Sequence, residues 1–227
     1  MSARLRIDIW SDVMCPWCVV GYYNLATALR ELADEIEAEI RWQPFELNPD
    51  MPAEGEGQVE HIARKYGRTL EQAESGGGTM RAAMQEAGFD PTWPGEGDPP
   101  PAMMWNTFEA HRLLRWVLVK LGPGVQTQLK LALFAAHFRD RRRIGERAVL
   151  LDIAESCGVD RAEADAALDD PALAQAVRVE ERHAYDANIT GVPAMVVQGQ
   201  FLIPGAQPPE TYAQLLRRIA AKLGEAA

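Results

Sequence analysis

The chain has 227 residues, 47% of them apolar and 25% charged, which predicts a globular protein with a substantial core. Its formal net charge of −10 at pH 7 argues against nucleic acid or an anionic membrane as the main partner. No apolar run approaches the roughly 18 residues of a membrane-spanning helix, so we expect no membrane segment.

The chain begins with a predicted strand, in which Leu5, Ile7 and Ile9 alternate with polar residues. Residues 1–4 lead directly into this strand, without the basic and apolar segments of a secretion signal. We therefore expect a cytoplasmic protein. Because a reducing cytosol keeps structural disulfides rare, cysteines there tend to be catalytic, bound to metal or inert.

Residues 15–18 read Cys-Pro-Trp-Cys and lie where this strand passes into a predicted helix. A thiol in the first turn of a helix faces unpaired N–H groups and the positive end of the helix dipole, and both favour the thiolate. Cys18 lies one turn further along the same face, so its sulfur can reach Cys15 and close a disulfide. Pro16 suits the start of a helix, where its missing N–H costs nothing.

A C-x-x-C motif is also compatible with half a zinc site or with a structural disulfide. Zinc needs further ligands, but the third cysteine, Cys157, has no neighbouring histidine, so we predict no metal site. A structural bridge over so short a loop would constrain the unfolded chain little. The position after a strand favours a redox-active pair.

A second strand is predicted at residues 40–45, where Ile40 and Trp42 alternate with polar residues and Pro44 marks an edge or a bulge. With the first strand and helix it completes a β-α-β unit, so the two strands should be parallel and joined by a right-handed crossover.

Residues 46–57 read as a loop, and helical patterns then dominate to about residue 170. One predicted helix holds Ile62, Tyr66 and Leu70, and the next ends at Gly88. The Gly-Gly-Gly stretch at 76–78 is interpreted as a flexible turn between helices. The later predicted helices cover 108–121, 129–137, 148–157 and 160–168. This block shows no strand pattern, so we expect it to be all-helical.

Pro171 opens another predicted helix, which reaches about residue 188. Thr-Gly-Val-Pro at 190–193 then precedes a β-hairpin at 194–203, and a last amphipathic helix starts at 208–210. The order of elements predicts an α/β core with a helical insertion. Residues 1–50 and 169–227 would form one discontinuous domain, and residues 51–168 the inserted helical domain.

The Cys-Pro-Trp-Cys motif after the first strand, with Thr-Gly-Val-Pro before a hairpin, resembles the thioredoxin superfamily. The helical insertion is similar to that of the DsbA-like branch. Nearly the whole chain takes part in this resemblance. Within the branch, three stretches look like the cytoplasmic FrnE-like group: FELNP at 45–49, NTFEAHR at 106–112 and GAQ at 205–207.

This resemblance implies that Pro193 is a cis-proline lying against the two cysteines, and an X-Pro bond is chemically suited to the cis form. The same group is similar to kappa-class glutathione transferases and 2-hydroxychromene-2-carboxylate isomerases, which use glutathione and carry a serine at the position of Cys15. This chain keeps both cysteines, which favours dithiol chemistry.

We therefore interpret the protein as an enzyme, a thiol–disulfide oxidoreductase with no tightly bound cofactor. The Cys15 thiolate attacks a disulfide of a protein or a small molecule, and Cys18 then resolves the mixed disulfide. If Pro193 is cis, Val192 would pair its backbone with an extended substrate segment, and we expect Pro16, Trp17 and Pro193 to complete the substrate-binding surface. Trp17 supplies no positive charge, so we expect less thiolate stabilisation than a histidine would give. We expect a monomer or a homodimer.

Four further features have simpler interpretations. Asp12 is a candidate for proton transfer, although a loop residue that hydrogen-bonds the backbone is the more ordinary reading. His111 lies on an apolar helical face and is expected in the core or a cleft; only the resemblance suggests that it contacts glutathione. Cys157 is interpreted as a buried small hydrophobe near a helix end, and the basic run 139–143 as a solvated helix end.

Two other functions remain open from the sequence. One is a glutathione-dependent isomerase or transferase, in which Cys15 stands in the place of the serine. The other is a chaperone-like binding module whose helical block covers hydrophobic clients. The ratio of disulfide reduction to isomerase turnover separates the first from the main hypothesis, and client holding by a protein without either cysteine separates the second.

Overall fold

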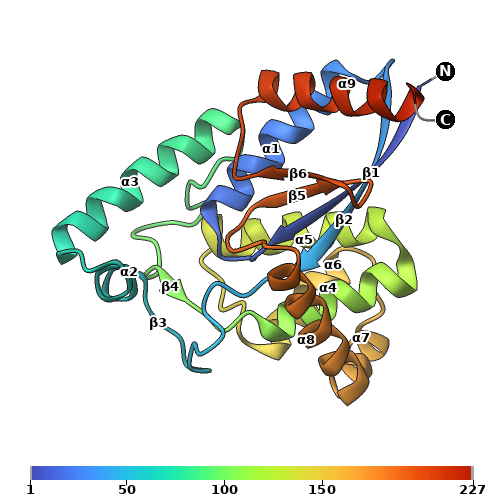
Figure 1. Cartoon of the computed structure of the whole chain (residues 1–227). Coiled ribbons are helices and arrows are strands. Elements are labelled where there is room, and N and C mark those ends of the chain that lie inside the picture. The colour runs from blue at the N-terminus through green and yellow to red at the C-terminus, as the bar shows by residue number, and fades with distance from the viewer. Residues whose placement is uncertain (1, 226–227) are drawn as a thin grey trace.

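A four-stranded sheet forms the centre of the molecule in this computed structural model, which describes residues 2–225 (Figure 1). The strands stand in the order β2-β1-β5-β6. Parallel pairing joins β1 to β2, whereas β1–β5 and β5–β6 are antiparallel, which confirms the predicted β-α-β unit and hairpin. The strands are β1 (Ala3–Ser11), β2 (Ile36–Pro44), β5 (Ala194–Val197) and β6 (Phe201–Pro204).

Nine α-helices surround this sheet within residues 2–225. The helix α1 connects β1 to β2, and α9 at the end of the chain packs against it, so the two lie side by side (Figure 1). Within the same residues, none of the helices combines the length and the apolar character that crossing a membrane requires. The helices are α1 (Pro16–Glu31), α2 (Gln58–Tyr66), α3 (Leu70–Ala87), α4 (Phe108–Leu121), α5 (Pro123–Phe134), α6 (Arg147–Ser156), α7 (Arg161–Leu168), α8 (Pro171–Asp186) and α9 (Pro209–Glu225).

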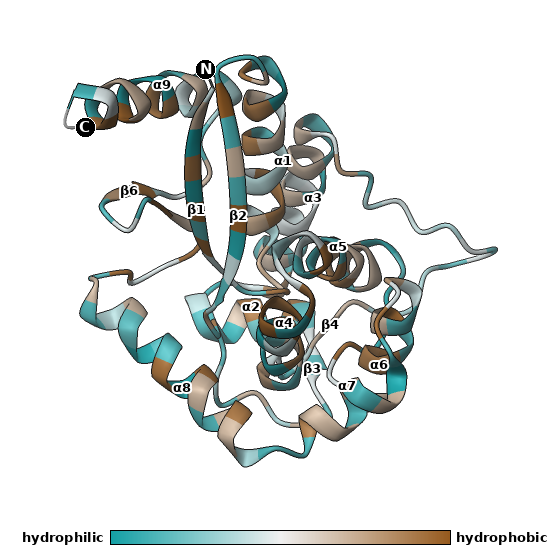
Figure 2. Cartoon of the chain, turned by 90° about the vertical axis from the view of Figure 1, so that its right-hand side faces the viewer, coloured by the Kyte–Doolittle hydropathy of each residue, from teal (hydrophilic) through white to brown (hydrophobic). Residues whose placement is uncertain are grey.

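Alternate residues of the strands face opposite sides of the sheet, as the banding of β1 and β2 in Figure 2 shows. Leu5, Ile7 and Ile9 of β1 are buried in one core with residues of α1 and α9. Trp10 belongs to a smaller cluster on the other side, together with Phe45 and Ala184 of α8. The sheet is therefore covered on both faces.

A second core lies among α4, α5, α6 and α7 and includes two residues that directly precede Cys15. Val13 and Met14 are buried in it, and the backbone N–H of Trp105 donates to the Met14 sulfur at 2.9 Å. Conversely, Met84 of α3 and Phe134 of α5 belong to the core of the sheet. Each of the two cores thus contains residues from both the sheet domain and the inserted block. The domain boundaries predicted at 51–168 stay a prediction.

Near its C-terminal end, the edge strand β2 is hydrogen-bonded by a side chain from α5. Gln126, which is fully buried, donates to the carbonyl of Trp42 at 2.8 Å and accepts from its N–H at 2.9 Å. The amide side chain therefore satisfies both backbone groups, as a neighbouring strand would.

Two helix-boundary predictions for the inserted block were wrong. The predicted helix through Tyr66 and Leu70 is interrupted, because Gly67 adopts a left-handed φ of 62° and ends α2. The stretch 76–78 is not a turn but the interior of α3. A capping box formed by Thr69 and Gln72 starts this helix, which continues through the glycines despite their low helix propensity.

The inserted block also contains a small sheet, so it is not all-helical. The strands β3 (Glu56–Gly57) and β4 (Met103–Met104) pair in antiparallel fashion. Each has only two residues, too few for an alternating pattern to show in the sequence.

Candidate active site

Both cysteines of the motif are free thiols at the start of α1. Cys15 is the N-cap residue and Pro16 begins the helix, as predicted. The carbonyl of Cys15 accepts the N–H of Cys18 at 3.0 Å, while its side chain makes no capping hydrogen bond. Cys15 is 3% exposed and Cys18 is 1% exposed, so both are buried. The Cys15 sulfur is covered by the carbonyl of Val192.

The loop before β5 meets the thiols. The Cys15 sulfur is placed to donate to the Val192 carbonyl at 3.6 Å, and the Val192–Pro193 peptide bond is cis. A Cβ atom on Gly21 of α1 would lie 2.9 Å from Pro193 Cγ, so the proline packs directly on the helix. The structure thus brings Val192 and Pro193 together with Cys15. Trp17, 48% exposed, lies at the surface beside them.

A hydrogen-bond chain holds this loop from behind. The Gly205 N–H donates to the Pro193 carbonyl at 2.8 Å. In turn the Tyr212 hydroxyl, fully buried, donates to the Gly205 carbonyl at 3.2 Å and accepts from the Gln207 N–H. Burial raises the pKa of Tyr212 to about 12, so the hydroxyl stays protonated and keeps its donor role.

Asp12 is completely buried three residues before Cys15. Its carboxylate accepts the N–H groups of Met14 at 3.2 Å and Leu47 at 2.7 Å, and His111 Nε2 lies 3.8 Å from Oδ1. Burial acts to raise the pKa of Asp12, but His111, the Leu47 N–H and the charge of Lys130 lower it on balance. The ordinary reading, a carboxylate that binds the backbone, is confirmed; proton transfer stays a prediction.

Sequence reasoning missed Lys130 of α5, which is fully buried. Its ammonium donates to the Ser11 carbonyl at 3.4 Å and lies 5.2 Å from the Trp42 ring centroid and 5.0 Å from that of Phe134. Burial lowers the pKa of Lys130 to about 8, against the opposing influence of Cys18, Asp12 and Cys15. The available signal was the i, i+4 pair Gln126 and Lys130 on the face of α5 that also carries the buried Leu129 and Leu133.

The two thiols shift each other's pKa in opposite directions. Burial acts to raise the pKa of Cys18, but hydrogen bonds with Cys15 and Ser11 and the charge of Lys130 lower it on balance. The hydrogen bond to Cys18, followed by burial, raises the pKa of Cys15 well above its ordinary value. That the attacking thiolate forms on Cys15, at the helix start, stays a prediction.

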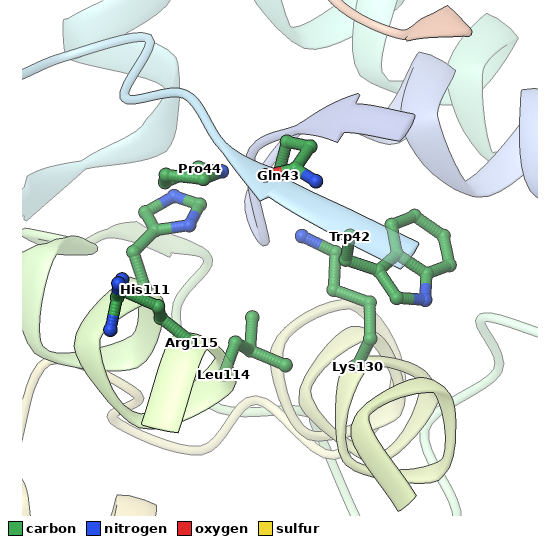
Figure 3. A pocket seen from close by; sticks show the side chains of 7 residues that line it. All are labelled: Trp42, Gln43, Pro44, His111, Leu114, Arg115 and Lys130. Atoms are coloured by element: carbon green, nitrogen blue, oxygen red, sulfur yellow. The ribbon is translucent and has the colours of Figure 1, made fainter. Parts of the chain in front are cut away.

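A small cavity lies next to Lys130, between α4, α5 and β2 (Figure 3). Its volume is about 10 Å³, enough for about one water molecule and too little for a substrate. His111, only 2% exposed, lines it as the predicted core or cleft histidine. The residues that line the cavity are Trp42, Gln43, Pro44, His111, Leu114, Arg115 and Lys130.

A second charged cluster, which was also not predicted from the sequence, lies around Glu46, next to Leu47. Arg178 of α8 donates to both Glu46 and Glu181, and its guanidinium stacks 3.7 Å from the Phe108 ring centroid. Burial raises the pKa of Glu46 to about 7, although Arg178 opposes this shift. The cluster joins α8 to the loop whose backbone binds Asp12.

The remaining candidates lie outside the site. Cys157 is the C-cap residue of α6, as the helix-end prediction said, but it is half-buried rather than buried. In the basic run, Arg139, Arg142 and Arg143 pair with Asp140, Asp152 and Glu146, which fits a solvated helix end. Among residues 2–225, no three His, Cys, Asp or Glu side chains gather as a metal site would require.

A dithiol at the start of a helix, facing a Val-Pro loop beside a mixed sheet, is the arrangement of a thioredoxin-like protein. Comparison with family models bears this out, because the model of the DSBA-like thioredoxin domain matches residues 6–217. The chain belongs to this family, and its α/β fold is that of the DsbA-like branch of the thioredoxin superfamily.

Three known proteins resemble the chain over most of its length. A probable DsbA oxidoreductase from Streptomyces coelicolor is 31% identical, with a TM-score of 0.82 over 94% of this chain and 89% of that one. The uncharacterized protein YwbO of Bacillus subtilis is 26% identical over 92% of this chain and 94% of its own length. A 2-hydroxychromene-2-carboxylate isomerase shares the fold, with a TM-score of 0.67 and 12% identity over 98% of this chain and 99% of that one.

Proposed function

We propose that this protein is a cytoplasmic thiol–disulfide oxidoreductase of the FrnE-like group, acting on disulfides of proteins or small molecules. The observation that carries the proposal is a pair of neighbouring free thiols, one of which, Cys15, lies against the carbonyl of Val192. That carbonyl lies beside the attacking sulfur, where an extended substrate segment can pair with the backbone.

The position of Cys15 against the Val192 carbonyl supports a definite order of steps. Cys15 loses its proton to solvent and attacks one sulfur of the substrate disulfide as the thiolate. The first substrate sulfur leaves as a thiolate, and Cys15 is joined to the second in a mixed disulfide. Cys18 then loses its proton to solvent and attacks Cys15, which releases the second substrate thiolate. Two electrons pass from the dithiol to the substrate, and the reverse sequence oxidises a substrate dithiol.

The other site residues support these steps without bond changes of their own. Trp17 and Pro16 offer an apolar surface next to Cys15, because Trp17 is half-exposed. Asp12 fixes the backbone at Met14 and Leu47 and so holds the loop that precedes the dithiol. Pro193 keeps Val192 against Cys15 through its packing on Gly21.

Trapping tests the proposal. In the protein with Cys157→Ala, the further change Cys18→Ala should accumulate a mixed disulfide through Cys15 when oxidised substrate is added, because the resolving thiol is missing. The matched change Cys15→Ala should accumulate none at the same site. Peptide mapping by mass spectrometry reads both results. Equal trapping by the two variants, or none by either, contradicts the assigned roles.

The fold shared with 2-hydroxychromene-2-carboxylate isomerase supports a second candidate, a glutathione-dependent isomerase or transferase. In that case Cys15 alone would act, with bound glutathione as cofactor. The two functions respond differently to Cys18→Ala: oxidoreductase turnover requires Cys18, whereas isomerase turnover with glutathione does not. Insulin reduction and isomerisation of 2-hydroxychromene-2-carboxylate, measured on the same variant, separate them.

A further inference from the structure

Tyr212 of α9 brings a polar group into the core of the sheet, behind the loop that carries Pro193. Its side chain is fully buried, and a Cβ atom on Gly21 of α1 would lie 3.5 Å from its hydroxyl oxygen. Burial of a hydroxyl costs free energy unless the group is hydrogen-bonded, whereas the ring of a phenylalanine would fill the same space without that cost. The bonds of the hydroxyl therefore decide what the residue does.

Both bonds of this hydroxyl go to the turn at residues 205–207, which follows β6. The hydroxyl donates to the Gly205 carbonyl and accepts from the Gln207 N–H, each at 3.2 Å. A third bond ties the turn to α1, since the side-chain amide of Asn24 donates to the Gln207 carbonyl at 2.9 Å. The turn is thus held to α9 and to the helix of the dithiol at the same time.

The same turn holds the loop that faces the thiols. The Gly205 N–H donates to the Pro193 carbonyl at 2.8 Å, and Gly205 adopts a φ of 70°, which favours glycine. The carbonyl of Val192, the residue before Pro193, lies 3.6 Å from the Cys15 sulfur. Hydrogen bonds and adjacent residues of the chain therefore connect the Tyr212 hydroxyl to the contact between Val192 and Cys15.

From this path we infer that Tyr212 is a positioning residue, which sets where the Val192 carbonyl lies against Cys15. The inference rests on the proposed function and names a further residue for the same reaction. Tyr212 does not touch the substrate, because its side chain is fully buried. It acts through Gly205 and Pro193 on the backbone with which an extended substrate segment pairs, and its own covalent bonds do not change during the reaction.

This role predicts a difference between two kinds of disulfide. A protein disulfide in an extended segment must present its sulfur to Cys15 and pair its backbone with Val192 at the same time. A small disulfide, such as bis-hydroxyethyl disulfide, needs only to present its sulfur. A shift of the Val192 carbonyl should therefore slow the reaction with the protein disulfide selectively, whereas a loss of folded protein would slow both reactions by the same factor.

The test is Tyr212→Phe, which keeps the ring and removes the hydroxyl. Since a misplacement of about 1 Å can cost about a hundredfold in rate, a smaller shift should lower kcat/KM for insulin reduction about tenfold and change that for bis-hydroxyethyl disulfide less than about twofold. The control is Tyr23→Phe, at a half-buried tyrosine of α1 that packs against Phe89, and it should change neither value. Equal effects of Tyr212→Phe on the two substrates, including no effect, or an equal selective loss in Tyr23→Phe, overturn the inference.

Hydrogen exchange gives a measurement that does not depend on turnover. In Tyr212→Phe the Gly205 N–H should exchange at least about tenfold faster, because the residue that bonds Pro193 is no longer held at its carbonyl. The Gln200 N–H, which bonds the Val197 carbonyl at the other end of the same hairpin, is the internal reference and should keep its rate. An unchanged rate at Gly205, or an equal acceleration at Gln200, contradicts the inference.

The two measurements separate this inference from the proposed function. If the unmodified protein reduces neither disulfide, the proposed function fails, and the exchange rates still decide whether Tyr212 holds the loop. If the unmodified protein reduces both, but Tyr212→Phe alters neither the ratio of the two rates nor the exchange of Gly205, the inference fails alone.

Discussion

The sulfur of Cys15 lies 3.6 Å from the carbonyl oxygen of Val192, a residue 177 positions later in the chain. This contact places the start of α1 against the loop that leads into β5. It depends on close packing behind it, because Pro193 lies on Gly21 with no room for a Cβ atom. The approach of the two segments is therefore open to a test that leaves both cysteines intact.

We predict that Gly21→Ala slows disulfide turnover about tenfold or more, because the new Cβ would lie 2.9 Å from Pro193 Cγ and push the loop from Cys15. Overpacking costs about 1–3 kcal/mol, but alanine regains about 1 kcal/mol of helix propensity, so the loss of stability should be small. Steady-state turnover and urea unfolding measure the two effects.

The matched control is Gly78→Ala in α3, where a new Cβ meets nothing within 4 Å. It should raise stability by about 0.5–1 kcal/mol and leave turnover unchanged. Unchanged turnover in Gly21→Ala would show that the distance between Val192 and Cys15 does not govern the reaction.

Replacement of Gln126 by leucine should lower the free energy of unfolding by about 1–3 kcal/mol, since the N–H and C=O of Trp42 would lose their partner in a buried place. Denaturant titration measures the loss. Thr127→Val, at a half-buried position, removes only the acceptor of the Trp42 indole and should cost less. A loss in Gln126→Leu no greater than that in Thr127→Val would contradict this reading of the edge.

Protonation of His137 should destabilise the fold in acid. Burial, with the charge of Arg141, lowers the pKa of His137 to about 4 from an ordinary value of 6.5. Between these values the unfolded chain binds a proton that the folded chain does not, so stability falls as pH drops from 6.5 to 4, by up to about 3 kcal/mol. His137→Leu should remove this dependence, as unfolding at pH 7 and pH 5 would reveal; an unaltered dependence would refute the assignment.

Glu46 should act in the opposite direction. Burial raises its pKa from 4.5 to about 7, so the folded chain keeps a proton that the unfolded chain loses. Its contribution is complete below pH 4.5 and declines as pH rises to 7. Glu46→Gln should remove this decline, so the variant gains stability relative to the unmodified protein between pH 5 and 7. The pH ranges over which Glu46 and His137 affect stability overlap. Over this shared range the free energy of unfolding should rise with pH in Glu46→Gln and fall with pH in His137→Leu. Equal slopes in the two variants would contradict both assignments.

Most of the fold could be predicted from the sequence, because local patterns and tertiary packing favour the same elements. The alternation of Leu5, Ile7 and Ile9 identifies β1, and the Pro16 and Pro171 helix starts lie where predicted. The low helix propensity of glycine led to the wrong prediction of a turn at 76–78. Packing of α3 on α1 and the capping box at Thr69 outweigh that propensity. The two-residue strands β3 and β4 are too short to show an alternating pattern in the sequence.

The residues of the candidate site that are close in sequence could be predicted, whereas those brought together by tertiary packing could not. Cys15 and Cys18 share one helical turn, so their proximity follows from spacing alone. The position of Lys130 depends on how α5 packs against β2, which no local pattern determines. The same applies to the Glu46–Arg178 pair, whose members lie 132 residues apart.

The amide of Gln126 also bears on how these molecules behave in a crowded solution. An uncovered sheet edge is a template on which a second chain can pair and aggregate. At Trp42 both backbone groups of β2 are already bonded to α5, so a foreign strand could add there only after that helix had been displaced. A helix that carries the lysine beside the dithiol thus also shields the protein from growth of its sheet by strand addition at this edge.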